Sequence, residues 1–561
     1  MSLRPVVIAL LLCLGACGHQ KKHDAPDLEP AADLSPPPPD LLVPPSGIGK
    51  ACTSDANCAT GQLCLTEADG LRGGYCSLDC NSVACPSDAT CFQQGAGSRF
   101  CLRSCKVDAD CRTSEGYTCT NDTCFPPLMP DGVPPGTNDG GACVTPIVAP
   151  SPAGGLFGTA QNVTSGVQFA SECQLAVDGT SKRVVIAYND LSGDGIGFTR
   201  SGDDGLMFQA PLVLPANTLV DMNNSQSDPV VAVDAAGTFF ISFLGYDLDA
   251  NGNTSKMQLW VARSNDGGVT FADIFPALPA AEGKNGGLDK PWIAVNPVDQ
   301  SLMVTWFLAG ASNTEIRMSR SVDHGQTWST PVTLSDSTRP QADRNLAQLA
   351  FGADGMAVVA WVELVSEQFG ATDNQIYLQR IKADGTLDGA NVLVSRPPDS
   401  PAFDDPSVAV FGTNVYVGFV SGTPKGDWDV RIATSLDGGA TFATSVKVND
   451  DSTCATHFNQ QIQTDAAGNV HALWIDNRYL VGNVFHAVSA PATSMAPLGF
   501  GAGTFVNSAS FGFTTDRASS QWLGDYLGMS IVGGEIYAAW SAPPSASQDT
   551  QIYFSRGLLP K

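Results

Sequence analysis

The sequence predicts an all-β protein: a β-propeller of seven blades, with six blades as the alternative, preceded by a small disulfide-rich region. Three observations predict this architecture. A Ser-x-Asp-x-Gly phrase recurs four times, a hairpin pattern recurs seven times, and twelve of the seventeen cysteines are confined to residues 52–124. Charged residues make up only 15% of the chain, whereas glycine occurs 57 times and proline 37 times, a composition typical of turn-rich β-structure.

A chain of 561 residues is too long for one compact domain, and its composition changes several times along its length. We therefore expect five segments in this order: a lipoprotein signal peptide (1–17), a Pro-rich disordered tether (18–50), a Cys-rich disulfide repeat region (51–125), a Pro/Gly-rich linker (126–158) and the propeller (159–561).

The first segment has the features of a targeting signal. Arg4 provides a positive charge, and Val6 to Leu14 form an apolar stretch that is too short to span a bilayer. The stretch ends in Leu-Gly-Ala-Cys17, which resembles a bacterial lipobox; the alternative is an ordinary signal peptide with an incidental cysteine. The resemblance implies lipidation of Cys17, and Gly18 after it favours the outer membrane or cell surface. The polar tether that follows cannot bury a core.

The Cys-rich region divides into three units of four cysteines each. Because each unit has few large apolar residues, we expect two disulfides per unit, with the pairing left open. Zinc is disfavoured, since CxxC pairs and histidine are both absent. The region would serve as a rigid stalk or as a contact module. An odd set remains outside it, Cys143, Cys173 and Cys454, of which we predict that Cys143 pairs with Cys173. The twelve cysteines expected in disulfides are Cys52, Cys58, Cys64, Cys76, Cys80, Cys85, Cys91, Cys101, Cys105, Cys111, Cys119 and Cys124.

The repeated phrase predicts a tight turn. Its four copies are SGDDGLMF from Ser201, SNDGGVTF from Ser264, SVDHGQTW from Ser321 and SLDGGATF from Ser435. The Asp side chain can accept backbone N–H bonds, and the Gly permits a positive φ. The phrase resembles the Asp-box, or bacterial neuraminidase repeat, of the sialidase superfamily. That resemblance implies a propeller whose Asp-box turns lie on the face opposite the ligand.

Seven hairpins in succession predict the blades. Each consists of a short β-run, a Gly/Asp turn and a second alternating run, and a third strand follows. The seventh unit stops after its third strand, Gln551 to Phe554, so we expect the start of the domain near Gln161 to Thr164 to donate the missing one. Large aromatic residues end several second strands and are expected to pack between blades: Trp306, Trp361, Trp474 and Trp540.

Propeller geometry places two sets of loops on one face, around the mouth of the central channel. Acidic and amide groups recur there in nearly every blade, and each Asp alternatively caps its own strand or turn. We expect this face to bind a glycan or a surface protein. The ligand-binding candidates are Asp228, Asp405, Arg344, Arg478 and Arg517.

The sialidase resemblance also implies a possible catalytic set. Sialidases bind the substrate carboxylate with three arginines and attack with a tyrosine, which corresponds to Tyr526 here; Asp525 and Asp289 are the other catalytic candidates. Two departures weigh against it: the Phe/Tyr-Arg-Ile-Pro motif is missing, with Glu172-Cys-Gln-Leu at the first blade instead, and no Glu closely precedes Tyr526. A sialidase-like glycoside hydrolase is therefore the alternative to a binding function.

Composition limits partners and cofactors. The formal net charge of −26 should repel nucleic acid, so the membrane is expected as a partner only through the lipid anchor. No cofactor is required. Calcium is the ion that one loop could hold, because oxygen ligands alternate there before a glycine, although Gln258 stands where a bidentate acid is expected; a solvated turn is the alternative. Its candidate ligands are Asp247, Asp249, Asn251 and Asn253.

Overall fold

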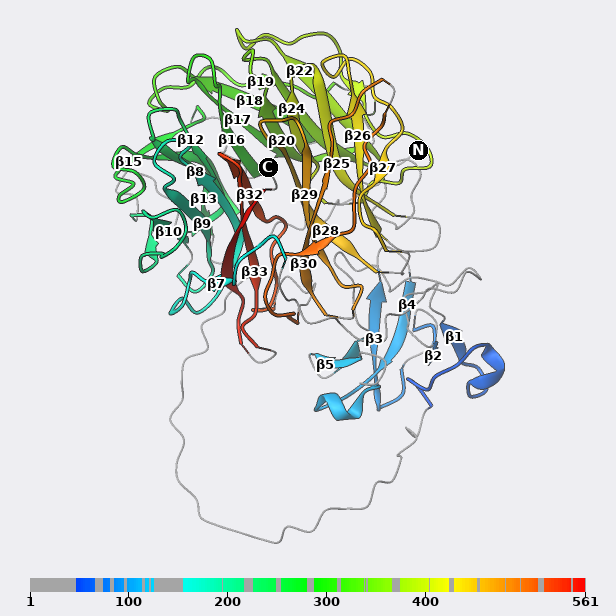
Figure 1. Ribbon diagram of the computed structural model, residues 1–561. Coiled ribbons are helices and arrows are strands. Elements are labelled where there is room, and N and C mark those ends of the chain that lie inside the picture. Colours follow the sequence, from blue (N-terminus) through cyan, green and yellow to red (C-terminus); the bar gives the residue numbers. More distant parts are fainter. Residues whose placement is uncertain are drawn as a thin grey trace, which may run out of the picture. The chain divides into compact units, whose positions relative to one another are not determined.

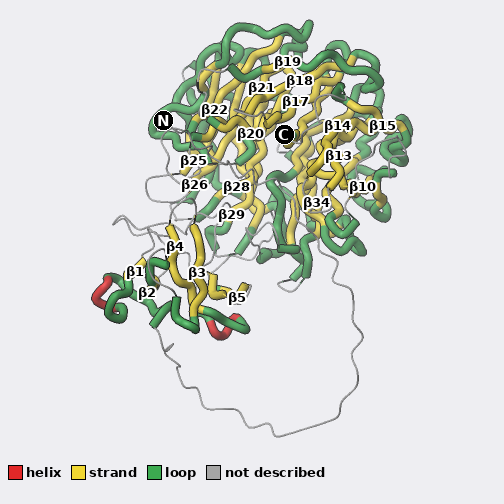
Figure 2. The backbone as a smooth tube through the Cα atoms, turned by 180° about the vertical axis from the view of Figure 1, so that it is seen from behind, coloured by secondary structure: helices red, strands yellow, loops and turns green. Residues whose placement is uncertain are grey.

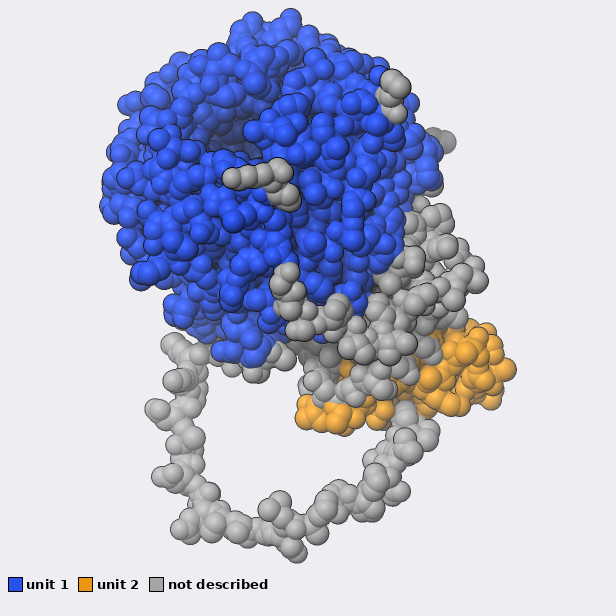
Figure 3. All heavy atoms as spheres, viewed as in Figure 1, with its two compact units in different colours: residues 1–12, 138–561 blue, residues 13–137 orange. Residues whose placement is uncertain are grey.

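The computed structural model divides the chain into two compact units, a Cys-rich unit and a propeller unit (Figure 3). Each is described by itself. The structure describes residues 47–65, 74–80, 85–94, 98–112, 117–120, 123–125, 155–193, 195–215, 225–248, 254–279, 287–309, 314–336, 339, 342–365, 374–402, 404–422, 428–451, 455–479, 481–494, 496–512, 519–545 and 548–559. No helix among these residues is long and apolar enough to cross a membrane.

Seven four-stranded antiparallel sheets form the propeller, which confirms the seven-blade prediction (Figure 1). In the first six blades the strands pair in chain order. Blades 1 to 4 are β8 (Ala170–Val177), β9 (Val184–Asp190), β10 (Gly195–Ser201), β11 (Leu212–Val213); β12 (Ser225–Val233), β13 (Phe239–Leu248), β14 (Thr254–Ser264), β15 (Asp273–Pro276); β16 (Leu288–Val295), β17 (Leu302–Ala309), β18 (Thr314–Ser321), β19 (Val332–Thr333); and β20 (Asp343–Phe351), β21 (Ala357–Leu364), β22 (Gln375–Ile381), β23 (Val392–Leu393).

The last blade is closed by the strand predicted to close it. Its fourth strand is β7 (Gln161–Asn162), in which Asn162 lies opposite Tyr553 and Gln161 opposite Phe554. The pairing leaves no open edge between the first and last blades. Blades 5 to 7 are β24 (Ser407–Phe411), β25 (Asn414–Gly422), β26 (Trp428–Ser435), β27 (Val446–Lys447); β28 (His457–Thr464), β29 (Val470–Asp476), β30 (Asn483–Ser489), β31 (Thr504–Phe505); and β32 (Gly528–Val532), β33 (Glu535–Ala542), β34 (Gln551–Leu558), β7.

Hydrophobic side chains fill the spaces between successive blades. One cluster of buried residues lies between each pair of neighbours, including the pair formed by blades 7 and 1. The four predicted tryptophans are fully buried in these clusters, as expected. Trp361, Trp474 and Trp540 each stack on the aromatic residue directly opposite on the third strand, with ring centroids 5.9–6.3 Å apart.

The four Ser-x-Asp-x-Gly phrases form the same turn between the third and fourth strands. In the turn at Asp437, the Ser435 hydroxyl accepts the N–H of Gly439 at 2.8 Å, and the carboxylate accepts the N–H and hydroxyl of Thr441. Gly439 has a φ of +84°, which glycine adopts without strain. Strand directions place these turns at the opposite end of the blades from the starts of the innermost strands.

Replacing Asp437 by alanine should lower the free energy of unfolding by about 1 kcal/mol, because the turn loses the acceptor for Thr441. Urea unfolding of the purified protein measures this loss. Thr441→Val, which removes only the hydroxyl, should have a smaller effect. An Asp437→Ala protein as stable as the wild type would contradict a structural role for the turn.

Arginines link three of these turns, and the corresponding turn at Asp384 in blade 4, to the preceding blade. Arg200 donates to the Gly267 carbonyl at 3.3 Å, and Arg263 donates to the His324 carbonyl at the same distance. Arg320 reaches Asp384 and Arg556 reaches Asp204 in the same way. Since Arg556 joins the seventh blade to the first, this contact repeats across the closure.

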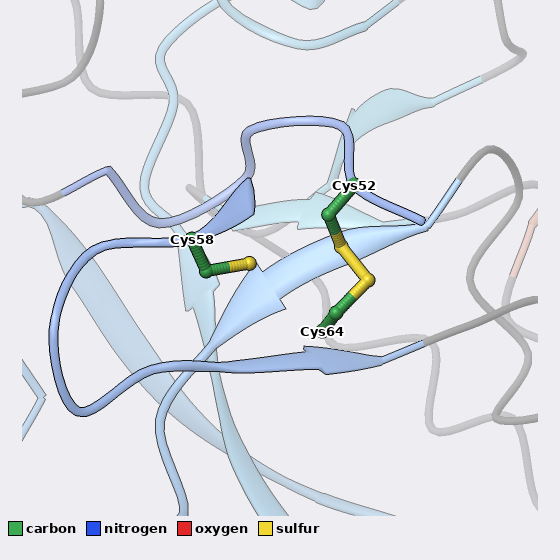
Figure 4. Close-up of side chains that lie close together, drawn as sticks. All are labelled: Cys52, Cys58 and Cys64. Carbon is green, nitrogen blue, oxygen red and sulfur yellow. A yellow bond between two sulfur atoms is a disulfide. The ribbon is translucent and has the colours of Figure 1, made fainter. Parts of the chain in front are cut away.

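The Cys-rich unit consists of three small two-stranded sheets and holds the only helical turns among the described residues (Figure 2). In the first two four-cysteine repeats of this unit, the first cysteine pairs with the third and the second with the fourth (Cys52–Cys64 is drawn in Figure 4). Cys111–Cys124 follows the same pattern, and Cys105 is also disulfide-bonded. The elements are η1 (Asp55–Asn57), β1 (Leu63–Leu65), β2 (Tyr75–Ser77), β3 (Ala89–Gln94), β4 (Ser98–Arg103), η3 (Asp108–Asp110), β5 (Thr118–Thr120) and β6 (Thr123–Phe125).

The prediction that Cys173 pairs with Cys143 is wrong. Cys173 is a free cysteine, fully buried on β8, and burial raises the pKa of its thiol to about 12. It packs with apolar residues of blades 7 and 1, so it serves as a small core residue. Cys143 and Cys454, like Cys17, lie outside the described residues.

Candidate functional site

A β-bulge interrupts the innermost strand near its start in five of the seven blades. It lies in β8, β12, β16, β20 and β28. The first bulged residue adopts a left-handed backbone with φ between +48° and +57°, which is strained for residues other than glycine. These residues are Glu172, Asp228, Lys290, Leu346 and Asn459.

The bulge itself does not require a charged side chain, because blade 4 places Leu346 in the same conformation. Three of the other four positions nevertheless carry charged residues, and all three are at least 94% buried. Charged residues are costly to bury unless they are paired. The charges at the bulges therefore need an explanation beyond the fold.

Lys290 lies at the point where these residues meet. Its ammonium contacts Asp525 at 2.7 Å, Asp228 at 2.8 Å and Glu172 at 3.1 Å, so four blades contribute to one ion-pair network. Burial, which opposes the charged forms, raises the pKa of Asp405 and of Asp289, and each of these carboxyls also interacts electrostatically with Lys290. We call the set of Glu172, Asp228, Asp289, Lys290, Asp405 and Asp525 the Lys290 cluster.

Amide groups fix the cluster in place. Asn189 donates to Glu172 and accepts the backbone N–H of Asp228, which ties blade 1 to blade 2. Asn459 donates to the Gly524 carbonyl at 2.8 Å, tying blade 6 to blade 7. The backbone around the cluster is thus held by side-chain hydrogen bonds that cross between blades.

The carboxyl groups of the cluster outnumber its single ammonium. Burial, reinforced by neighbouring carboxylates, raises the pKa of Asp289 to about 7 and that of Asp405 to about 8, and it holds the pKa of Glu172 well above its ordinary value. Burial alone would lower the pKa of Lys290, but the carboxylates outweigh it and hold the pKa well above the usual range. Lys290 is therefore a permanent cation, and some of the acids around it carry protons at neutral pH.

The geometry does not favour a metal ion at this point. Among the described residues, the sets of three or more potential ligands that lie within 4.8 Å of one another consist only of cysteines, and disulfides already occupy those. The carboxylates instead surround the Lys290 ammonium, which stands where a cation would be held. The cluster can accept hydrogen bonds and can exchange protons.

The structure brings together five of the predicted site residues: Asp228, Asp289, Asp405, Asp525 and Tyr526. Glu172 and Lys290 were not predicted as site residues. A signal for Lys290 was present, because Lys290-Pro291 occupies the same place in the bulge of its strand as Asp228-Pro229. Glu172 carries no comparable signal, since Cys173 follows it.

The predicted arginines do not reach the cluster. Arg344 is fully buried, pairs with Glu363 at 3.0 Å, and donates to the Arg339 and Ala342 carbonyls. Arg478 pairs with Asp476 and Asp450, each at 2.6 Å. Both guanidinium groups are thus occupied by the protein itself and are structural, whereas Arg517 lies outside the described residues.

Tyr526 lies beside Lys290, with the ammonium 5.6 Å from its ring centroid, and its hydroxyl donates to the Pro229 carbonyl at 3.3 Å. Burial and the nearby Glu172 and Asp228 carboxylates hold the pKa of Tyr526 well above its ordinary value. A nucleophilic tyrosine needs the opposite change, so this placement does not support the attacking role that the resemblance implied. Its ring packs edge-on against Trp292.

Most of the predicted calcium-binding residues lie outside the described residues. Asp247 lies on β13, and its carboxylate is 3.8 Å from the Lys256 ammonium. Asp249, Asn251 and Asn253 lie outside the described residues. The calcium site therefore stays a prediction.

A second buried charge network lies on blade 6. His457 is 1% exposed; its Nε2 lies 3.0 Å from Asp451 and 3.2 Å from Asp476, and its Nδ1 faces the Trp428 carbonyl. Burial alone would lower the pKa of His457, but the Asp476 and Asp451 carboxylates outweigh it and raise the pKa to about 10. The imidazole is therefore a buried cation at neutral pH.

This pKa predicts a loss of stability in alkali. The charge of His457 stabilises the fold fully below the ordinary pKa of about 6.5, and that stabilisation is lost as the pH rises to about 10. The unfolding free energy should fall by at most about 1.4 kcal/mol per pH unit in this range. Urea unfolding at a series of pH values measures the slope, and His457→Gln should flatten it. An unchanged slope in the variant would contradict a charged His457.

An axial cavity of about 360 Å³ lies among the innermost strands of all seven blades. It extends from Trp292 and Gln348 near the bulges to Val177 at the other end of β8, and no residue of the Lys290 cluster lines it. The propeller unit is visibly hollowed in the space-filling view (Figure 3). The cluster therefore lies at the bulge end of the axis, beyond the cavity.

No family model and no curated protein matches the chain. Solved structures similar to the propeller include a Hadza microbial sialidase (13% identity, TM-score 0.41, 68% of this chain and 74% of that chain) and an ulvan lyase (10%, 0.46, 70% and 94%). An α-L-arabinofuranosidase from Fusarium graminearum is also similar (13%, 0.42, 60% and 98%). The propeller's structural neighbours thus include glycoside hydrolases and polysaccharide lyases, and the similarity is one of fold.

Proposed function

We propose that the propeller binds a carbohydrate at the Lys290 cluster. The observation that carries the proposal is the convergence of charged side chains from blades 1, 2, 3 and 7 on one point, three of them on strained backbone. Strained residues and buried charges are retained where the surrounding structure and function both need them. The Leu346 bulge supports this, because it shows that the backbone alone does not need the charge.

The chemistry of the cluster favours a sugar over the other candidate partner, a surface protein. Carboxylate oxygens accept hydrogen bonds, and sugar hydroxyls can donate them. The cluster is also enclosed: Asp525 and Asp289 are only partly exposed, and the remaining members are buried. A small ligand group can contact enclosed polar atoms that a flat protein surface does not reach.

The alternative, hydrolysis of a glycoside, is favoured by one specific observation. Glycosidases pair a carboxylic acid with a carboxylate, and the pKa values of Asp289 and Asp405, raised to about 7 and about 8, place both forms of a carboxyl group in the cluster near neutral pH. Acidic sugars such as sialosides would be repelled by these carboxylates. The proposed hydrolysis is therefore limited to uncharged or basic glycosides.

A glycan array probed with the full chain tests the binding function. The wild type should bind a defined set of glycans, and Asp289→Asn should weaken that binding at least tenfold without changing the melting temperature. Asp354→Asn, which removes an exposed charge from a hairpin turn at the other end of the blades, is the control. Absence of glycan binding by the wild type would overturn the proposal.

Two further assays address the other candidates. Repeating the glycan array with EDTA tests whether the calcium loop contributes to binding, and incubation with aryl glycosides tests whether the protein hydrolyses a glycoside.

We further propose that the protein is held at the bacterial surface by a lipid on Cys17, with the Pro-rich segment as its tether. The lipobox resemblance and the disulfides of the Cys-rich unit support an exported location. Metabolic labelling with a palmitate analogue should mark the wild type and not Cys17→Ser. Equal labelling of both proteins would overturn the anchor.

A further inference from the structure

We propose that the ligand of the Lys290 cluster carries a protonated amino group, so that amino sugars are the class of carbohydrate this site selects. The inference rests on the proposed carbohydrate-binding function and narrows it. It is carried by the charge balance of the cluster and by one buried carboxyl oxygen to which none of the described residues donates a hydrogen bond.

The charge balance favours a cation. Five carboxyl groups surround one ammonium, and only Glu172, Asp228 and Asp525 contact that ammonium directly. Asp289 and Asp405 add two further acids within electrostatic range of it. In a buried setting an excess of one charge attracts the opposite charge much more strongly than it does in water.

Asp405 is the member of the cluster that we propose to accept a hydrogen bond from the ligand. It is 4% exposed, and its Oδ1 accepts no hydrogen bond from the described residues. Its backbone carbonyl, in contrast, accepts a bond from Gln460. Buried carboxyl oxygens are almost always paired, so this oxygen marks a position at which a donor is expected.

An ammonium group would both balance the excess of carboxyl groups and donate a hydrogen bond to the Asp405 oxygen. It supplies up to three N–H donors and a positive charge, whereas a hydroxyl supplies one donor and no charge. A divalent metal ion would also satisfy a carboxylate oxygen, but among the described residues no three carboxylates lie close enough together to ligate one. Uronic and sialic acids would add a further negative charge to the cluster.

The direction of approach is set by the exposed members. The Asp525 side chain is 14% exposed and its carboxylate contacts Lys290, while Asp289 on β16 is also partly exposed. An amino group arriving here meets the carboxylates beside Lys290, and Asp405, which interacts electrostatically with the same Lys290, is the proposed acceptor. Arg344 and Arg478 do not compete, because their guanidinium groups are paired with Glu363 and Asp476.

A matched pair of ligands tests the inference. Glucosamine oligomers and N-acetylglucosamine oligomers of equal length differ only in the acetyl group on each nitrogen, which abolishes its positive charge and adds a carbonyl and a methyl group. Calorimetric titration of the full chain at slightly acidic pH should give at least tenfold tighter binding of the free amine. Asp405→Asn keeps the shape of the side chain but removes its capacity to ionise beside a bound cation, so the preference should shrink to less than threefold. Asp354→Asn, the control that removes one negative charge at the other end of the blades, should keep it.

The outcomes separate the two proposals. If neither oligomer nor any arrayed glycan binds, the carbohydrate-binding function itself is wrong. If acetylated or uncharged glycans bind as tightly as the amine, the function stands and the amine selectivity is overturned. A preference for the amine that survives in Asp405→Asn would overturn the role given to Asp405.

Discussion

Replacing Lys290 by methionine is expected to destabilise the propeller by about 3–5 kcal/mol at neutral pH, the range found when one partner of a buried ion pair is removed. Three carboxylates that now contact the ammonium would be left without their counter-charge in the interior. Methionine preserves the length and the apolar stem of the side chain, so the change isolates the charge. Chemical unfolding, followed by tryptophan fluorescence, measures the loss.

The loss should shrink in acid. As the pH falls, the buried acids take up protons, and the raised pKa values of Asp289 and Asp405 place the start of this uptake near neutrality. Lys447→Met is the matched control, because Lys447 pairs with Asp429 in a position that is 32% exposed, where a pair contributes less than about 1 kcal/mol. Equal losses for the two variants would contradict the central role of Lys290.

Reduction of the disulfides is expected to unfold the Cys-rich unit while the propeller keeps its structure. The unit's core is small and consists largely of cysteines with a few residues such as Tyr75 and Leu102. Each native disulfide of a small domain contributes about 2–5 kcal/mol, which is comparable to the whole stability of such a unit. Hydrogen exchange of the full chain, with and without reductant, reports on both units in one experiment.

The double variant Cys58→Ser, Cys76→Ser provides a milder version of the same experiment. It removes one bridge, Cys58–Cys76, and should increase exchange mainly in β1 and β2. Cys173→Ala in the propeller serves as a control for the substitution of a cysteine that forms no bridge. Retained protection in the fully reduced unit would contradict its dependence on disulfides.

The repeating features of the fold could be predicted because each is encoded locally. The Ser435 to Phe442 phrase contains its own acceptors, donors and glycine, and the hairpins carry their own alternation and turns. Closure of the ring by Gln161 to Thr164 could be predicted by counting strands, because the seventh repeat contains only three. The number of blades needed the same count, which the structure confirms.

The site could be predicted only in part, because its residues interact across blades. Asp228, Asp289, Asp405 and Asp525 could be assigned to one end of the blades by topology. The pairing of Lys290 with Glu172, which lie 118 positions apart, depends on a left-handed residue in each bulge, and no local pattern announces that conformation. The prediction that Arg344 and Arg478 bind a ligand failed because each guanidinium group forms an ion pair on its own blade, with Glu363 and Asp476 respectively.

Closure of the ring by β7 has a consequence for the timing of folding. The contact between Thr164 and Gln551 spans 387 positions, so the first strand of the domain waits for its partner until Gln551 has been synthesised. During that interval, the outer edge of the unfinished blade and the apolar flanks of blades 7 and 1 lack their cover. Such intermediates are prone to aggregate, and contacts this distant form slowly. The step that limits production of the protein should therefore be the final joining of its two ends, and the blades in between should gain protection first.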